Sequence, residues 1–104
     1  MTRDEAILAA AVALSQSGEY ATMTRGSIAD AAGMAPSNVS NYGRTGYYNR
    51  TFVSVGVMDR IRSHVMEWAV TNGDLALLRQ GLAMRHPAAL DAPEQLRMAA
   101  LAGA

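Results

Sequence analysis

Cysteine and lysine are both absent from this chain of 104 residues. Without cysteine, the protein forms no disulfide, holds no metal through thiolates and carries no cysteine nucleophile. Every basic residue is therefore an arginine, and nine arginines balance nine acidic residues. The absence of cysteine agrees with a reducing compartment, and we expect the protein to be cytoplasmic.

No apolar run is long enough to cross a bilayer, which takes about 20 residues in a helix. The longest run, residues 6–14, follows the acidic pair Asp4-Glu5 and not the basic segment of a signal peptide. Half of the residues are hydrophobic. This composition predicts one small domain, residues 1–104, with a modest core and no membrane partner.

Positive charge gathers in the middle of the chain, although the formal net charge is zero. Residues 20–63 hold five arginines against two aspartates, and no acidic residue occurs between Ala31 and Met58. Phosphate binding requires a locally positive surface, not a basic protein as a whole. The distribution favours a nucleic-acid partner, and a chance excess of a few charges is the alternative.

Apolar residues recur at helical spacing along most of the chain, which predicts an all-α fold. Thr2 and Glu5 form the pattern of a capping box, and Gly18 is a natural stop for the helix that follows it. We expect helices over residues 3–17, 24–32, 36–42, 46–70 and 74–84, and a final helix from about 94 to 101. A strand over residues 47–57, which contain β-branched side chains, is the alternative in that region.

The longest predicted helix, residues 46–70, rests on apolar residues that recur every three or four positions: Tyr48, Phe52, Val55, Met58, Ile61, Val65 and Trp68. Gly56 falls inside this span, where a glycine costs about 1 kcal/mol relative to alanine. We expect it to mark a kink or a close contact between helices. Asp74 should cap the following helix, His86-Pro87 should interrupt it, and Asp91-Ala-Pro-Glu94 should cap the last one.

Residues 24–43, TRGSIADAAGMAPSNVSNYG, have the pattern of two short helices around a tight turn. Ala29 is small enough for the second helix to cross close over the first. Gly33 can adopt the positive φ that ends a helix. Ile28 and Val39 can bury the inner faces of the two helices. The pattern is typical of a helix-turn-helix DNA-binding unit, and an ordinary helical hairpin with a polar outer face is the alternative.

Small polar residues remain on the outer face of the second predicted helix, whose N-terminal part enters the major groove in such units. Asparagine can make two hydrogen bonds to adenine, and serine can contact a base or a phosphate. The predicted base-reading residues are Ser37, Asn38, Ser40 and Asn41. The predicted phosphate-binding residues, which flank this helix, are Thr24, Arg25, Arg44, Tyr47 and Arg50. Tyr42 and Tyr48 are expected in the core.

Residues 7–42 resemble the N-terminal DNA-binding domain of TetR-type transcriptional regulators. The resemblance is carried by Ile7-Leu8, Ala10-Ala11, Leu14 and Gly18, by Ile28 to Met34, and by Ala35 to Tyr42. It implies a three-helix DNA-binding unit over residues 1–45. A chain of 104 residues has no room for the family's small-molecule effector domain, so the resemblance implies a small regulator of a phage or mobile element.

Nothing in the sequence predicts catalysis, since no serine lies in a strand–turn–helix elbow and cysteine is absent. His64 and Glu67 stand one helical turn apart, but a solvated helix face explains this spacing better than a metal site does. We therefore expect a protein that is not an enzyme and has no cofactor.

Two hypotheses from different classes follow. The first is a sequence-specific transcriptional regulator that binds double-stranded DNA as a homodimer, with residues 46–104 forming the dimerisation and packing segment. Val53 and Val57 lie off the apolar stripe of the long helix and are candidates for the dimer seam. The second is a helical protein-interaction module, such as a phage-encoded inhibitor of a host protein, that does not read DNA.

Overall fold

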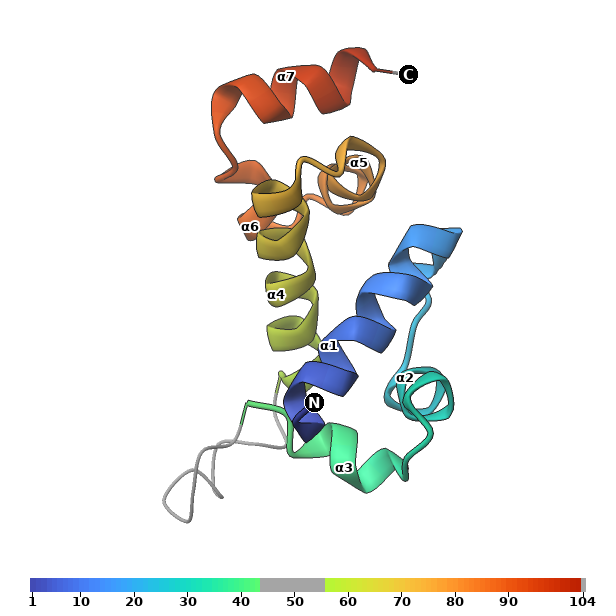
Figure 1. Ribbon diagram of the computed structural model, residues 1–104. Helices are drawn as coiled ribbons and strands as arrows, with labels where there is room; N and C mark the ends of the chain where they lie inside the picture. The colour runs from blue at the N-terminus through green and yellow to red at the C-terminus, as the bar shows by residue number, and fades with distance from the viewer. Residues whose placement is uncertain (44–55, 104) are drawn as a thin grey trace.

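The computed structural model describes residues 1–43 and 56–103, and the predicted all-α fold is confirmed (Figure 1). The elements are α1 (Arg3–Leu14), the π-helical turn η1 (Ser15–Glu19), α2 (Arg25–Ala32), α3 (Pro36–Ser40), α4 (Val57–Asn72), α5 (Leu75–Ala83), α6 (Pro87–Leu90) and α7 (Glu94–Ala102). Within those two ranges no residue forms a strand. None of the described helices is long and apolar enough to span a membrane.

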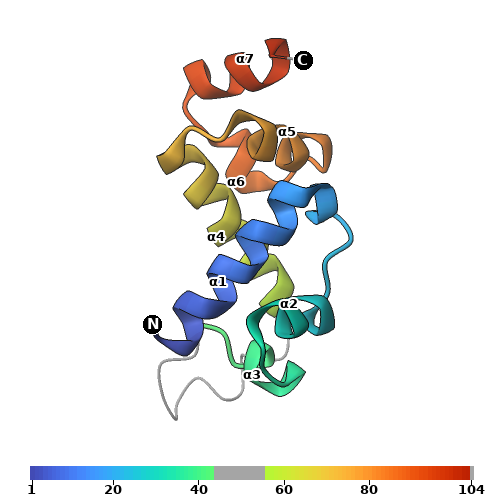
Figure 2. The ribbon, with the colours of Figure 1, turned by 45° about the vertical axis from the view of Figure 1, so that its right-hand side comes forward.

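The helices form an elongated molecule with principal extents of 43 × 26 × 23 Å. The central helix α1 packs against both α2 and α4, and α2 packs against α3. At the other end, α5 packs against α4, α6 and α7. As a result, α3 and α7 lie at opposite ends of the molecule (Figures 1 and 2).

The predicted start of α1 is confirmed, because Thr2 and Glu5 form both hydrogen bonds of the capping box at 3.1 Å. The helix ends at Leu14, three residues before the predicted end, and continues as the turn η1. Gly18 has a φ of +87° and reverses the chain there, as expected of a helix stop. Inside this bend the buried Ser15 hydroxyl donates to the Ala11 carbonyl at 2.7 Å.

The predicted position of Gly56 inside a long helix is wrong. Gly56 has a φ of +78° and is the N-cap of α4, which begins at Val57. A right-handed helix cannot continue through a residue in the left-handed region, so α4 does not extend back through this position. The rest of the predicted helix, residues 46–55, lies outside the described residues.

The C-terminal caps are partly as predicted. Asp74 accepts from the backbone N–H of Leu77 at 3.1 Å and caps α5, which confirms that prediction. His86 does more than interrupt a helix, because its Nδ1 accepts from the backbone N–H of Ala88 and starts α6. The predicted cap at Asp91 is wrong: Asp91 ends α6, and the N-cap of α7 is Pro93, which has no side-chain hydrogen bond.

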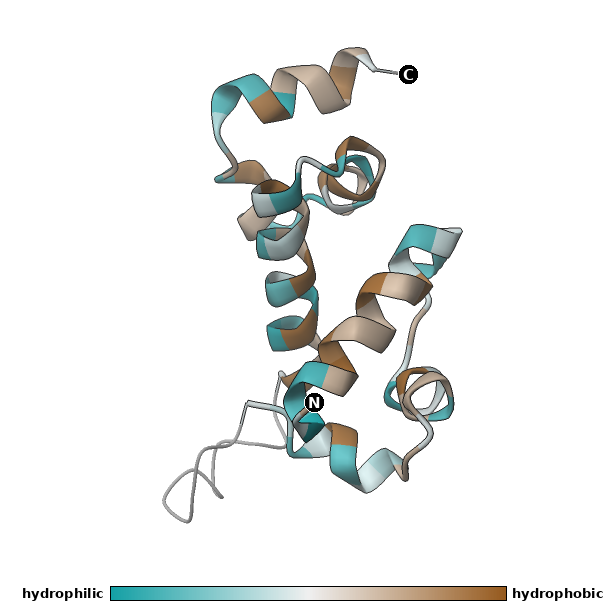
Figure 3. Cartoon of the chain, viewed as in Figure 1, coloured by the Kyte–Doolittle hydropathy of each residue, from teal (hydrophilic) through white to brown (hydrophobic). Residues whose placement is uncertain are grey.

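The core runs along the middle of the molecule, where the apolar side of α4 faces α1 (Figure 3). Ile7 and Ala11 of α1 are fully buried, as are Ile61 and Val65 of α4. Of the predicted apolar stripe, Ile61 and Val65 are therefore confirmed as core, and Met58 and Trp68 are partly buried against it.

A second close contact joins α4 to α5 at Gly81, which has no side chain to separate them. A Cβ atom built on Gly81 would lie 2.1 Å from the sulfur of Met66 and 3.0 Å from the Cβ of Ala89. Met66 is itself fully buried. The approach of these helices at Gly81 therefore leaves no room for a larger residue unless Met66 shifts.

Gly81→Ala should destabilise the fold by about 1–3 kcal/mol, the cost of overpacking a buried contact. Gly26→Ala in α2 is the matched control, because its added Cβ would meet only the Thr24 hydroxyl at 3.7 Å. That control should be neutral or slightly stabilising, since alanine is the better helix former. Urea denaturation followed by far-UV circular dichroism measures both, and equal or greater stability of Gly81→Ala would contradict the prediction.

Candidate nucleic-acid interface

The unit formed by α2, a tight turn and α3 has the local structure that its sequence predicts. Thr24 caps α2 by accepting from the backbone N–H of Ser27 at 3.1 Å, and the Ser27 hydroxyl accepts from the N–H of Thr24 at 2.8 Å. Gly33 ends α2 with a φ of +70°. The N–H of Met34 then donates to the Ala29 carbonyl at 3.0 Å and closes the turn.

The inner faces of the two helices are closed to solvent. Ile28 and Ala29 of α2 and Val39 of α3 are fully buried, and Met34 in the turn is half-buried. The absence of a bulky side chain at Ala29 allows the close contact between α2 and α3. This packing leaves the polar residues of α3 on its outer side.

Helix α3, the predicted recognition helix, is shorter than predicted, because it ends at Ser40 and Asn41 is its C-cap. Ser37 is exposed in the first turn, while Asn38, Ser40 and Asn41 are half-buried. The structure thus gathers the four predicted base-reading residues on one short segment. Ser37 and Asn38 occupy the N-terminal turn, where a groove-facing surface is expected.

Arg25 connects the two predicted classes of DNA contact. Its guanidinium nitrogen Nη1 donates to the hydroxyl of Ser40 at 2.8 Å, across the gap from α2 to α3. Arg25 is exposed, as is Thr24 beside it. The other predicted phosphate-binding residues, Arg44, Tyr47 and Arg50, lie outside the described residues.

Charged side chains bind the backbone of the three residues that follow α3. Arg3 donates to the carbonyl of Asn41 at 3.0 Å, and Arg60 donates to the carbonyl of Tyr42 at 2.9 Å. The backbone N–H of Gly43 donates to the carboxylate of Asp4 at 3.1 Å. We call these contacts between residues 41–43 and Arg3, Asp4 and Arg60 the polar clamp.

The polar clamp was not predicted from the sequence. Its charged side chains come from the start of α1 and from α4, 18 to 39 positions away from the backbone groups that they bind. No motif or helical spacing relates residues so far apart. The sequence indicates one local feature of this segment. The presence of glycine at position 43 is compatible with its positive φ of +75°.

Tyr42 lies in the core, as predicted, with 4% of its surface exposed. Its hydroxyl is 2.7 Å from Nδ1 of His64, and the two rings meet edge to face. His64 is therefore part of the packing between α4 and the end of α3. The solvated face predicted for His64 and Glu67 holds only for Glu67, which is exposed. Among the described residues, no three side chains of histidine, cysteine, aspartate or glutamate are placed to hold a metal.

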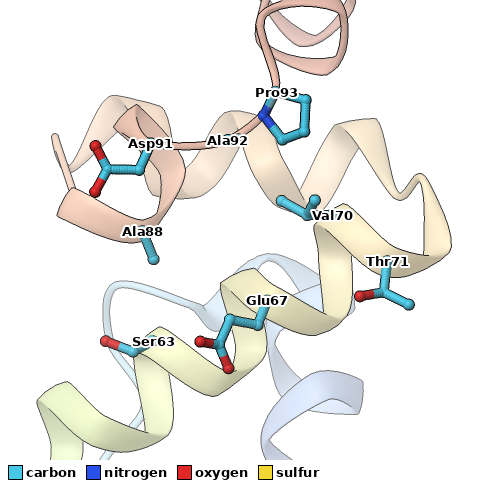
Figure 4. A pocket seen from close by; sticks show the side chains of 8 residues that line it. All are labelled: Ser63, Glu67, Val70, Thr71, Ala88, Asp91, Ala92 and Pro93. Carbon is cyan, nitrogen blue, oxygen red and sulfur yellow. The ribbon is translucent and has the colours of Figure 1, made fainter.

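A cavity of about 510 Å³ lies far from α3, between α4 and the segment that contains α6. Ser63, Glu67 and Thr71 line it from α4, and Asp91 lines it from the other side. These polar side chains do not point toward a common centre (Figure 4). The cavity therefore lacks the convergent groups of a ligand or catalytic site.

The buried Tyr42 hydroxyl makes the fold sensitive to alkaline pH. Burial raises the pKa of Tyr42 above its ordinary value of 10.0, and the carboxylates of Asp4 and Glu67 raise it further. Because the folded state holds this proton more tightly than the unfolded chain, the stabilisation is fully present below pH 10 and is lost as the pH rises through the raised pKa.

Tyr42→Phe should lower the free energy of unfolding at pH 8 by about 0.5–1.5 kcal/mol, the usual value of one hydrogen bond. Above pH 10 the free energy of unfolding should fall more steeply for the wild type than for Tyr42→Phe. The difference in free energy of unfolding between the two proteins should therefore become smaller as the pH rises. Burial raises the pKa of Tyr20 to about 12. Because Tyr20 is present in both proteins, its effect on the pH dependence of stability is the same in each. Urea denaturation from pH 8 to pH 11 tests this, and a constant gap would contradict it.

The resemblance of residues 7–42 to TetR-type DNA-binding domains rests on the motif residues alone. The function must be inferred from the residues and contacts described above. No protein-family model matches the chain, and comparison with curated proteins and with solved structures found no similar protein.

Proposed function

We propose that this protein is a sequence-specific transcriptional regulator that reads the major groove of double-stranded DNA with α3. The observation that carries the proposal is the α2–turn–α3 unit, which presents a short polar helix at one end of the molecule beside the exposed Arg25. In helix-turn-helix proteins the second helix enters the groove with its N-terminal residues toward the bases. The exposed Ser37 and half-buried Asn38 occupy that position.

The side chains around α3 divide into two roles. Asn38 and Asn41 are suited to base edges, because an amide can both accept from and donate to adenine. Arg25 is suited to a phosphate, since it is exposed and flanks the helix. Arg44, Tyr47 and Arg50 remain predicted phosphate contacts, and the resemblance to TetR-type domains adds support to this assignment.

A homodimer is the second part of the proposal. One five-residue helix covers only a few base pairs, and a two-fold axis that doubles it is the usual solution. Val57 does not serve as the seam, because it is already buried within one chain, and Val53 lies outside the described residues. Large apolar side chains are instead exposed near the opposite end, on α6 and α7: Leu90 at 39%, Met98 at 58% and Leu101 at 63%. We place the dimer seam there.

Replacing Asn38 or Asn41 by alanine should weaken binding to the selected duplex by about 1–3 kcal/mol and relax the preference at one base position. Selection from random duplex DNA identifies the site, and fluorescence anisotropy measures each affinity. Arg25→Ala is the matched control. It should weaken binding to all sequences alike, and it should reduce the slope of log affinity against log salt concentration by about one unit.

Unchanged affinity and preference in both asparagine variants would overturn the base-reading assignment. If the wild type binds no duplex even at low salt, the proposed function itself is wrong. A stable complex with another protein, formed without any DNA binding, would then favour the helical protein-interaction module.

Sedimentation equilibrium at micromolar concentration tests the dimer. A mass near the chain mass of 11.0 kDa would rule the dimer out, and about twice that mass would support it. Met98→Glu and Leu101→Glu should return a dimer to monomer, because each places a charge in the proposed seam. Ala31→Glu, on an exposed position of α2, is the matched control and should leave the dimer intact.

A further inference from the structure

The recognition helix cannot fix its own orientation. It has five residues, little more than one turn, and its N-cap residue Ala35 makes no side-chain capping bond. Helices this short are not stable alone in water. The direction in which its side chains point therefore depends on what holds its two ends.

Its C-terminal end is held by the polar clamp. Three consecutive residues, 41–43, each give one backbone group to a charged side chain of α1 or α4. Hydrogen bonds that involve a charged partner are shorter and stronger than neutral ones. The N-terminal end, where the exposed Pro36 and Ser37 lie, has no comparable support among the described contacts.

The fit at Gly43 is close. A Cβ atom on this residue would lie 2.8 Å from Cδ of Arg60, so the stem of Arg60 packs directly against the backbone. The φ of +75° also disfavours any other residue. Arg60 and Gly43 are half-buried, while the side chain of Asp4 is 38% exposed.

Asp4 has no part in the cap of its own helix. The capping box of α1 uses Thr2 and Glu5, and the Asp4 carboxylate instead receives the N–H of Gly43 at Oδ2 and the guanidinium of Arg3, 3.2 Å away, at Oδ1. A change at Asp4 can therefore remove the contact with Gly43 and leave the capping box in place.

We propose that Asp4 and Arg60, assisted by Arg3, are positioning residues that set the orientation of α3 and thus the register of its base-reading side chains. This inference rests on the proposed function. Asp4 is the informative residue, because an acidic side chain near DNA would by itself only repel phosphates. A positioning role and a purely electrostatic role predict opposite results for its removal.

Asp4→Ala and Asp4→Asn separate the two roles, because both remove the charge and only asparagine keeps an oxygen that can accept from Gly43. Asp30→Ala is the matched control, since it removes an exposed carboxylate from α2. The first measurement is hydrogen exchange of the Gly43 amide in the free protein. Asp4→Ala should speed this exchange by at least about tenfold, while Asp4→Asn and Asp30→Ala should stay near wild type.

The second measurement is the ratio of affinities for the selected duplex and a scrambled one. Asp4→Ala should reduce this ratio by about tenfold without weakening binding to the scrambled duplex, and Asp4→Asn should restore it. Arg60→Met, which keeps the stem and removes the donor, should reduce the ratio as well, and Arg60→Lys should recover part of it.

Two results would overturn the positioning role. One is an unchanged rate of hydrogen exchange at the Gly43 amide in Asp4→Ala, and the other is equal specificity ratios for Asp4→Ala and Asp4→Asn. Tighter binding of all duplexes by every Asp4 and Asp30 variant, with no change in the ratio, would assign Asp4 to electrostatic repulsion alone. Absence of duplex binding by the wild type would instead remove the proposed function. In that case the exchange measurement still decides whether Asp4 holds Gly43.

Discussion

The packing of α1 between α2 and α4 is the interaction on which the rest of the structure depends. Ile7 and Ala11 lie at the centre of the core with no exposed surface. The small side chains of α1 let both neighbouring helices approach it closely. The same helix carries Arg3 and Asp4 at its N-terminal end, so its burial also fixes the charged groups that hold the end of α3.

The proposed function places two conflicting requirements on the short helix α3. An outer face that is open to DNA leaves few contacts to hold the helix in place. The structure meets both by burying Val39 on the inner side and by binding the backbone of residues 41–43 from behind. Such support is typical of binding sites whose side chains must be held within narrow geometric limits.

The elongated shape separates the two surfaces that the proposed function requires. Helix α3 lies at one end, and α7 lies at the other (Figure 1). Helix α7 carries the exposed apolar residues Met98 and Leu101. Contact through α7 would leave both copies of α3 free.

The sequence alone determined the features that act within one helical turn. Thr2, Thr24 and Asp74 cap their helices as predicted, and Gly33 ends α2, because each uses backbone groups a few residues away. Gly56 shows the limit, since glycine is compatible with both a helix interior and a left-handed cap. Only the tertiary structure decided which side chains hold α3, because hydrogen bonds between distant residues depend on how the helices pack and leave no periodic pattern in the sequence.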